Sequence, residues 1–386
     1  MTKPRLVCLN NIPTPYRLFF YQLLSSELQR RGWDFQAWFM ASSEQGRHWS
    51  FQSEDFNFDH KFFPGWSPRF SGVILHINPG ILREIALRPP QVLVSAGAWG
   101  MPTTIFSSFA GKSTRKVFWS ESHFLSIGRS DAATNWLRSR LLNRYDAFAV
   151  PGRLAREYVE HFAPGKRIIP LPNLVDAQAF GAGVQREREN RDDILLRFAL
   201  PGDKKVLLLP VRLHPVKAIL PFLRALTSLS KPVLGQFVVV IAGDGPLRLE
   251  LETWISEHKL PCVLLLGDQQ QQSLVELYAI ANGIALPSYS DCNPLAVIEA
   301  LWAKLPLLLS DRVGNHYETL VEGQNGWLFS TDDVSSVCSS VKSWALMSGD
   351  QLATYGLASS KIAHASFRPE LVIKNLVDEL LTLNCG

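Results

Sequence analysis

The chain has 386 residues, of which 46% are hydrophobic and 19% charged, and its formal net charge is +4. This composition excludes an intrinsically disordered chain, a collagen-like repeat and a coiled coil. Because a domain usually has roughly 100–200 residues, the length favours two domains, with three as the alternative.

The small net charge hides an asymmetry between the two halves. Residues 1–180 carry 21 Lys and Arg against 13 Asp and Glu, or +8, whereas residues 181–386 carry 18 against 22, or −4. A basic first half joined to an acidic second half indicates two domains with different partners.

The cysteine pattern and the hydropathy bear on the compartment. The five cysteines are Cys8, Cys262, Cys292, Cys338 and Cys385. Their scatter, without a C-x-x-C pair, argues against a disulfide framework or a zinc site and favours a reducing, cytoplasmic compartment. The N-terminus lacks a signal-peptide pattern, and the longest apolar stretch, Leu295–Leu309, is broken by Glu299 and Lys304. We expect no membrane span, while peripheral contact with the inner face of the membrane stays open.

Short apolar runs alternate with segments of helical period along the chain. In the first half the predicted strands are Arg5–Leu9, Phe35–Met40, Val92–Ser95, Lys116–Ser120 and Ala147–Val150, and a helix is expected over about Arg17–Arg30. In the second half they are Val206–Pro210, Phe237–Ala242, Val263–Leu266, Gly283–Leu286 and Leu307–Ser310. Such strands are typical of parallel sheets covered on both faces. The pattern predicts an α/β fold with two doubly wound, Rossmann-like domains.

The composition between the strand groups predicts the domain boundaries. The first domain is expected at residues 1–180 and the second at 201–366, with the charge-dense, glycine-containing segment 181–200 as a linker. Residues 367–386 are expected to form an amphipathic helix, because Leu371, Leu376, Leu380 and Leu383 fall roughly on one side of it.

Two strand ends in the second half carry candidate phosphate-binding features. Arg212 and Lys217 follow the strand Val206–Pro210, where fixed cations suit a diphosphate, although both could be solvated surface cations. Gly243 and Gly245 follow the strand Phe237–Ala242 and allow close backbone approach to a ligand, although a plain βα turn is the favoured interpretation.

The strongest signal runs from Asp291 to Glu299, between a strand and a helix. Asn293 is a good N-cap, and Pro294 fits the first helical position, so the amides of Leu295 and Ala296 would form an anion site at the helix start. The two carboxylates can accept hydrogen bonds from sugar hydroxyls. They could instead be an ordinary helix-start charge and a surface glutamate. However, a lone carboxylate in an apolar helix is costly unless it is paired or functional.

These segments together resemble the retaining, GT-B-fold glycosyltransferases of family 4 (group 1). That family carries an acid, seven residues and then Glu, which Asp291 and Glu299 match. Further matches are Arg212, Leu213 and Lys217; Ala242, Gly243, Gly245 and Pro246; Ser310, Asp311 and Gly314; Glu318, Gly323, Asn325 and Gly326; Pro172, Asn173, Val175 and Asp176; and the opening Asn11–Arg17. The similarity covers nearly the whole chain, and the ordered set in the second half is specific.

The resemblance implies a GT-B fold whose two domains face a cleft, with the C-terminal helix crossing back to the first domain. It implies transfer of a hexose from a nucleotide-diphosphate sugar to a glycan or lipid-linked acceptor, with retention, in polysaccharide or glycoconjugate biosynthesis. It also implies that no metal or other cofactor is needed.

The resemblance also assigns roles to residues of the second half. Arg212 and Lys217 would hold the diphosphate and stabilise the leaving charge. Asp291 would bind the transferred sugar, and Glu299 the ribose. The other donor-binding residues would be Gly243, Gly245, Asn293, Leu295 and Ala296.

His123 is the candidate catalytic residue of the first half. It follows the strand Lys116–Ser120, and many family members place a histidine in that region near the transferred sugar. A structural or capping histidine is the alternative.

The chain departs from the family pattern at several positions. Asp291 is one methylene shorter than the usual Glu, which leaves sugar selectivity in doubt. Ala218 and Lys304 stand where glycine is common, and Asn293-Pro294 replaces a glycine-containing turn.

The acceptor side is marked only by a basic, helix-like segment. It holds Arg129, Arg138, Arg140 and Arg144 together with Trp136, Leu137, Leu141 and Leu142. Contact with an anionic membrane or a lipid-diphosphate acceptor is one interpretation, and a solvated helix is the other. Nucleic acid is not expected, because no recognition motif is present.

Two rival functions remain on the sequence alone. A nucleotide-sugar epimerase of the GT-B fold would bind the same donor. A catalytically weak scaffold subunit of a glycan-assembly complex would fit the shortened Asp291.

Overall fold

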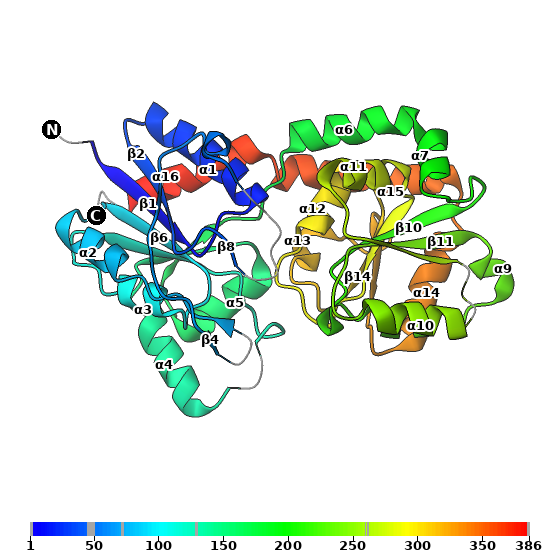
Figure 1. Ribbon diagram of the computed structural model, residues 1–386, viewed down its shortest axis with the longest axis horizontal. Helices are drawn as coiled ribbons and strands as arrows, with labels where there is room; N and C mark the ends of the chain where they lie inside the picture. The colour runs from blue at the N-terminus through cyan, green and yellow to red at the C-terminus, as the bar shows by residue number, and fades with distance from the viewer. Residues whose placement is uncertain are drawn as a thin grey trace. The chain divides into compact units, whose positions relative to one another are not determined.

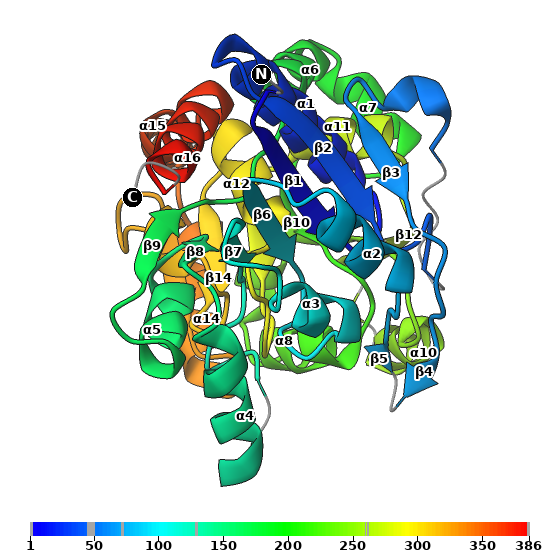
Figure 2. The ribbon, with the colours of Figure 1, turned by 90° about the vertical axis from the view of Figure 1, so that its left-hand side faces the viewer.

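A computed structural model describes residues 3–44, 51–70, 73–127, 130–258, 260 and 262–383. The helices and strands are drawn in Figure 1 and, from a second side, in Figure 2. Cys385 and Arg129, named above, lie outside the described residues.

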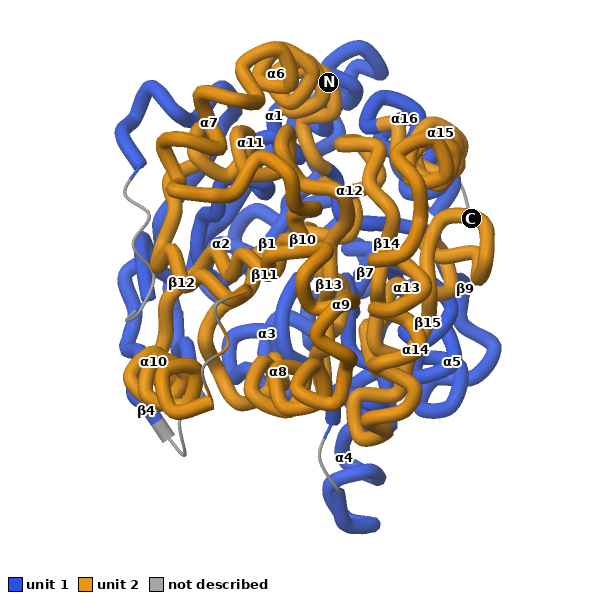
Figure 3. The backbone as a smooth tube through the Cα atoms, turned by 90° about the vertical axis from the view of Figure 1, so that its right-hand side faces the viewer, with its two compact units in different colours: residues 1–174, 369–386 blue, residues 175–368 orange. Residues whose placement is uncertain are grey.

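The chain divides into two compact units, coloured separately in Figure 3. Unit 1 comprises residues 1–174 and 369–386, and unit 2 comprises residues 175–368. Each unit is built on one parallel sheet with helices on both faces.

Unit 1 holds a seven-stranded parallel sheet in the order β3-β2-β1-β6-β7-β8-β9. The strands are β1 (Arg5–Asn10), β2 (Asp34–Phe39), β3 (His60–Phe62), β6 (Val92–Ala96), β7 (Arg115–Trp119), β8 (Ala147–Val150) and β9 (Arg167–Pro170), with a separate hairpin of β4 (Arg69–Phe70) and β5 (Val73–Ile74). The helices are α1 (Pro15–Arg30), α2 (Pro79–Leu87), α3 (Pro102–Ser107), α4 (Ala132–Leu142), α5 (Arg153–Phe162) and α16 (Pro369–Thr382).

Both faces of this sheet are buried, which explains its near-continuous apolar strands. In β1, Leu6 and Cys8 belong to the cluster shared with α1 and α16, whereas Val7 and Leu9 belong to the cluster shared with α2. The period of two therefore sends alternate side chains into different cores.

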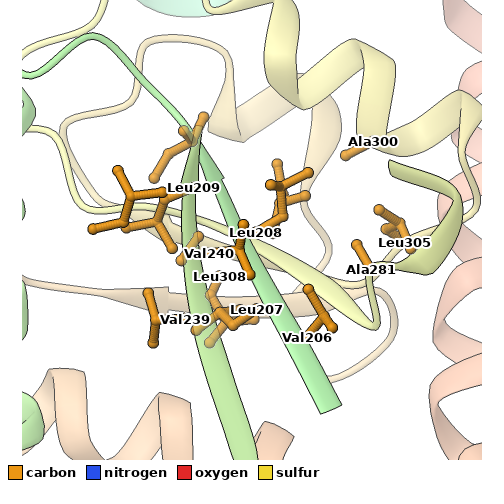
Figure 4. Close-up of a cluster of buried hydrophobic side chains, with 14 of the residues drawn as sticks. Val206, Leu207, Leu208, Leu209, Val239, Val240, Ala281, Ala300, Leu305 and Leu308 are labelled. Carbon is orange, nitrogen blue, oxygen red and sulfur yellow. The ribbon is translucent and has the colours of Figure 1, made fainter. Parts of the chain in front are cut away.

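Unit 2 holds a six-stranded parallel sheet in the order β12-β11-β10-β13-β14-β15. Its strands are β10 (Lys205–Pro210), β11 (Phe237–Ala242), β12 (Val263–Gly267), β13 (Gly283–Leu286), β14 (Leu307–Ser310) and β15 (Gly326–Phe329). Its helices are α6 (Ala177–Glu189), α7 (Arg191–Arg197), α8 (Ile219–Leu226), α9 (Lys231–Leu234), α10 (Arg248–Glu257), α11 (Gln271–Ile280), α12 (Leu295–Trp302), α13 (His316–Thr319), α14 (Val334–Ala345) and α15 (Gly349–Ser366). Figure 4 shows the aliphatic core around β10, with Leu207 and Leu208 among the labelled residues.

The ten predicted strands are all present, with ends that agree to within one residue. The prediction missed β3 and the hairpin strands β4 and β5, which are only two or three residues long, and also β9 and β15. In β9 only Ile169 is fully buried, so this strand lacks the apolar run that marks the other strands. In β15 the apolar run Trp327–Phe329 is only three residues long and was overlooked.

The predicted linker at 181–200 is wrong, because these residues lie in helices α6 and α7, which pack against α11. Val184, Ile194 and Leu195 enter the core of unit 2. One of the charged residues also contacts a neighbouring helix. Arg191 donates a hydrogen bond to the carbonyl of Ile280, at the end of α11, at 2.6 Å. A charge-dense run can therefore cap a neighbouring helix instead of staying in solvent.

The C-terminal helix α16 belongs to unit 1 although it follows unit 2 in sequence. It lies beside α1, and its Leu376 and Val377 are buried in the same core as that helix. Arg31 at the end of α1 forms an ion pair with Asp378 at 2.8 Å. This arrangement agrees with the predicted return of the helix to the first domain.

Truncation of Leu376 should destabilise unit 1. Leu376 is 3% exposed, so Leu376→Ala leaves a cavity and should lower the free energy of unfolding by about 2–5 kcal/mol. Hydrogen exchange of the β1 and β7 amides should report the loss. Leu371→Ala is the matched control on the same helix, because Leu371 is 36% exposed, and its cost should stay below about 1 kcal/mol. Equal costs for the two variants would contradict the packing of α16.

The backbone conformation at Lys304 explains why glycine is common at this position in the family. Its φ is 54°, directly after α12, a conformation that glycine adopts without strain. Lys304→Gly should therefore raise the free energy of unfolding by up to about 1 kcal/mol. Lys304→Ala keeps the Cβ and should give no such gain. Chemical denaturation of both variants measures the difference, and an equal gain in both would contradict the strain.

Candidate active site

The site of unit 2 lies where two neighbouring strands end. Strand β10 pairs in parallel with β11 on one side and with β13 on the other, so the order of the strands reverses beside it. Ligands of open α/β sheets bind at the carboxyl ends of the strands at such a switch point. Arg212 and Lys217 follow β10, and Asp291 to Glu299 follow β13.

The loop after β10 presents the two predicted cations. Arg212 is exposed, whereas Lys217 ends a short 3-10 turn, Pro215–Lys217. The Nδ1 of His214 accepts from the amide of Val216 at 3.3 Å and caps this turn. Ala218, the next residue, has a φ of 50°, which explains why the family favours glycine there.

The two turn glycines are required by backbone packing. A Cβ on Gly243 would lie 2.1 Å from the carbonyl oxygen of Val211, and one on Gly245 would lie 2.4 Å from that of Leu213. The glycines thus let the turn after β11 pack against the loop that carries Arg212. Their predicted contact with a donor stays a prediction.

Lys217 and Asp291 form an ion pair through Nζ and Oδ2. Both side chains are largely shielded, at 20% and 15% exposed. The backbone of Asp291 is fixed as well, since its carbonyl accepts from the amide of Gly314 at 2.7 Å. Two residues that lie 74 positions apart are thereby joined at the ends of β10 and β13.

The start of α12 differs from the prediction by one residue. Pro294, not Asn293, is the N-cap, and the helix begins at Leu295. Asn293 is held instead by Asn315, whose Nδ2 donates to the Oδ1 of Asn293 and to the carbonyl of Pro294, each at 3.1 Å. The amides of Leu295 and Ala296 stand in the first turn, where a helix leaves its amides without an intrahelical partner.

Glu299 accepts a hydrogen bond from a tyrosine that was not among the predicted site residues. The hydroxyl of Tyr278, on α11, donates to the Oε2 of Glu299 at 2.7 Å. Tyr278 is fully buried. The sequence did contain a signal for this contact. Tyr278 stands in an apolar helix, and the hydroxyl of a buried tyrosine needs a hydrogen-bond partner.

Burial sets the electrostatics of this pair. Loss of solvation raises the pKa of Glu299 above its usual value, and the hydrogen bond from Tyr278 partly offsets that rise. Burial and the neighbouring carboxylate also raise the pKa of Tyr278 well above its usual value, so the tyrosine remains a donor. The fold thus keeps the acceptor oxygens of Glu299 at the site, although burial of the charged carboxylate lowers the free energy of unfolding.

His123 belongs to unit 1, whereas the other predicted site residues belong to unit 2. It follows β7 and is 1% exposed. Its amide donates to the Oγ of Ser126 at 3.0 Å, and this hydroxyl donates back to the carbonyl of His123 at 2.8 Å. These bonds fix the backbone of His123 in a local turn.

A second polar group at the strand ends of unit 1 was not predicted. Glu44, after β2, accepts from Asn11 Nδ2 at 2.9 Å and lies 2.9 Å from His76 Nε2. Nearby in the fold, the guanidinium of Arg17 lies 3.5 Å over the ring of Trp119 and is ion-paired with Glu121 at 3.3 Å. Asn11 and Arg17 belong to the opening motif named above, whereas Glu44 and His76 come from other segments and no local motif marked them.

Comparison with known proteins supports glycosyl transfer. Residues 190–353 match the model of the family described as "Glycosyl transferases group 1". A D-inositol 3-phosphate glycosyltransferase of Mycolicibacterium smegmatis is 30% identical over 183 residues, which are 45% of this chain and 39% of that protein. A second relative, from Campylobacter jejuni, is 25% identical over 189 residues, which are 49% of this chain and 47% of that protein. It is named "GalNAc-alpha-(1->4)-GalNAc-alpha-(1->3)-diNAcBac-PP-undecaprenol alpha-1,4-N-acetyl-D-galactosaminyltransferase". These matches span less than half the length of either relative.

Solved structures share the fold over the full chain. HepE of Anabaena, in complex with UDP and glucose, gives a TM-score of 0.73 at 15% identity and covers 98% of this chain and 100% of its own. A glycosyltransferase of Rickettsia africae gives 0.77 at 11% identity and covers 99% of each chain. The chain therefore has the GT-B architecture of two Rossmann-like domains, as the sequence predicted.

Removal of the Glu299 charge should stabilise unit 2 in a pH-dependent manner. Because the folded-state pKa of Glu299 is raised, its ionisation weakens the fold as the pH rises above the ordinary value of 4.5. Glu299→Gln keeps an acceptor for Tyr278 and should raise the free energy of unfolding by about 1–3 kcal/mol at pH 8.

Denaturant titrations at pH 4 and pH 8 measure this effect. The gain should shrink towards pH 4, where the wild-type carboxyl is protonated. Glu257→Gln, at the exposed end of α10, is the control and should show little change at either pH. A gain in Glu299→Gln that is equal at both pH values would contradict a buried charge.

Proposed function

We propose that the protein is a retaining glycosyltransferase that moves a hexose from a nucleotide-diphosphate sugar to a glycan or lipid-linked acceptor. The observation that carries the proposal is the meeting of Arg212, Lys217, Asp291 and the first turn of α12 at the ends of β10 and β13. Cations and helix amides at one sheet edge suit a diphosphate, and the neighbouring carboxylates suit hydroxyls.

In the proposed reaction, the bond between the sugar's anomeric carbon and the diphosphate oxygen breaks. A bond to an acceptor hydroxyl oxygen forms on the same face, and the acceptor proton passes to the departing diphosphate oxygen. Arg212 and Lys217 take up the negative charge that grows on the diphosphate, aided by the amides of Leu295 and Ala296. Fixed cations and amides supply this stabilisation without a metal, so we propose a metal-independent enzyme that needs no further cofactor.

In this proposal Lys217 has two partners, the carboxylate of Asp291 and the diphosphate of the bound donor. The donor diphosphate shares the ammonium with Asp291, which leaves one carboxylate oxygen directed to the transferred sugar. Glu299, oriented by Tyr278, binds the ribose hydroxyls. UDP is the nucleotide we propose first, because HepE has been solved in complex with UDP, with UDP and glucose, and with UDP-glucose.

A lipid-linked acceptor is favoured by the name of the Campylobacter relative, which includes PP-undecaprenol. The net charge of +8 in residues 1–180 is consistent with an anionic acceptor on unit 1. We place the reaction in the cytoplasm, at the inner face of the membrane. No helix among the described residues is long and apolar enough to cross it.

Loss of either cation should abolish most of the transfer. Arg212→Ala and Lys217→Ala should each lower turnover at least roughly 100-fold, because each removes stabilisation of the leaving group. Release of UDP from UDP-sugars, in the presence of candidate acceptors, is the readout. Lys231→Ala, which removes an exposed cation on α9, is the control and should retain wild-type rates.

Three outcomes would contradict the proposal. Wild-type rates in both variants would exclude a role for these cations in catalysis. Conversion of the donor sugar without acceptor would favour the epimerase. A calorimetric titration in which no nucleotide-sugar binds would favour the scaffold subunit.

A further inference from the structure

An apolar pocket of about 430 Å³ lies between α2 and α3 of unit 1. Its lining includes Leu82, Ile85, Pro89, Phe106, Phe109 and Ala110. These residues stand at the carboxyl ends of the two helices, just before β6 and β7 begin. The pocket is therefore at the amino-terminal edge of the sheet, opposite the edge where parallel sheets bind substrates. Figure 2 shows α2 and α3 side by side on this part of the unit.

Large apolar side chains protrude around the pocket. Leu87 is 67% exposed, Phe106 50% and Phe109 56%. Isolated exposed apolar residues are ordinary, but Phe106 and Phe109 both line the apolar pocket and enlarge its apolar surface, and Leu87 ends the helix that forms the other wall. Such a patch on a protein surface marks a site of contact with a partner or a membrane.

Arginines are interleaved with the aromatic rings of this surface. The guanidinium of Arg144, just after α4, lies 3.6 Å over the ring of Phe109. Arg140 lies 5.4 Å over Trp136, which is itself 63% exposed. The spacing of four residues places Trp136 and Arg140 on one side of α4, and Arg144 follows the helix and contacts Phe109, so this stripe extends the patch along α4.

Arg138 does not belong to this stripe, although it lies between its members in sequence. It is 4% exposed, and its guanidinium lies 4.8 Å from the ring of Phe162 and 4.9 Å from that of Trp99. The cations of the basic segment predicted from sequence therefore fall into two groups. Arg138 is buried within unit 1, whereas Arg140 and Arg144 are exposed to solvent.

The charge of the surface is strongly positive. Residues 79–116 and 132–146, all described, contain seven Lys and Arg besides the buried Arg138, against two Asp and Glu. The two acids are Glu84, which is ion-paired with Lys61 at 3.1 Å, and Asp146, which accepts from the amide of Lys116 at 2.7 Å. Neither neutralises the exposed cations, which are Arg83, Arg88, Lys112, Arg140 and Arg144.

We propose that this surface, formed by α2, α3 and the outer side of α4, docks on a bilayer of anionic phospholipids. The rings of Phe106, Phe109 and Trp136 enter the headgroup region, and the apolar pocket receives part of a lipid chain. The cations bind the phosphates of the headgroups, because an anionic membrane surface attracts Lys and Arg side chains close to it. The arrangement joins an apolar face to a basic one, as in interfacial membrane helices. The proposal goes beyond glycosyl transfer, because it needs neither donor nor acceptor.

Flotation of the full chain with vesicles tests the proposal. Vesicles of equal parts phosphatidylglycerol and phosphatidylcholine should bind the protein at low salt, and vesicles of phosphatidylcholine alone should bind at least roughly tenfold less. Added salt should release the protein from the anionic vesicles. Phe106→Ser with Phe109→Ser, and separately Arg140→Gln with Arg144→Gln, should each lower binding roughly tenfold or more.

Matched variants in unit 2 keep the test specific. Leu249→Ser removes a side chain that is 75% exposed, and Lys361→Gln with Arg368→Gln removes two exposed cations. Both should bind vesicles like the wild type, and thermal unfolding checks that all variants fold. Equal binding to both vesicle types, no binding to either, or undiminished binding of the α3 and α4 variants would overturn the proposal. An acidic protein partner would then be the better candidate. Donor binding by unit 2 is measured separately, so failure here leaves the proposed reaction standing.

Discussion

The parallel pairing of β10 with β13 is the constraint on which the candidate active site depends. It brings Leu207 and Leu208 beside Gly283 and Ile284, although the two strands are separated by β11, β12 and their helices in sequence. Once these strands are neighbours, the loop that carries Lys217 and the loop that carries Asp291 end at the same sheet edge. The ion pair between them is a consequence of this register, as is the position of the first turn of α12.

Two carboxylates at this edge are held in different ways. Asp291 faces a cation, whereas Glu299 faces the neutral hydroxyl of a buried tyrosine. The ion pair with Lys217 compensates the negative charge of Asp291. The hydrogen bond from Tyr278 orients the carboxylate of Glu299 but offsets only part of its loss of solvation, so the pKa of Glu299 rises. A protein selected for stability alone would not keep such a group in an apolar helix, so the pair is typical of a functional site.

Local sequence patterns predicted the longer elements well and the marginal ones poorly. Strands such as Phe237–Ala242 are buried on both faces, so their apolar runs were unambiguous. Helices α6 and α7 were mistaken for a linker because seven of the eight residues from Arg186 to Asp193 are charged. The burial of these helices depends on α11 lying against them. Among the site residues, Lys217, Asp291 and Glu299 were predicted from motif spacing. Tyr278 and Asn315 were not, because their importance comes only from partners 21 and 22 positions away.

By itself, the sequence determined the two α/β domains, the amphipathic helix at residues 367–386 and the residues of the donor motif, because each depends on periodicity or spacing within a few turns of chain. The return of α16 to the first domain was implied by the family resemblance. The tertiary structure alone decided which strands are neighbours, which cation faces Asp291 and which tyrosine holds Glu299. It also separated the buried Arg138 from the outward Arg140 and placed Arg144 over Phe109. The physical reason is the same throughout: these contacts join segments whose separation along the chain carries no local signal, and only packing brings them together.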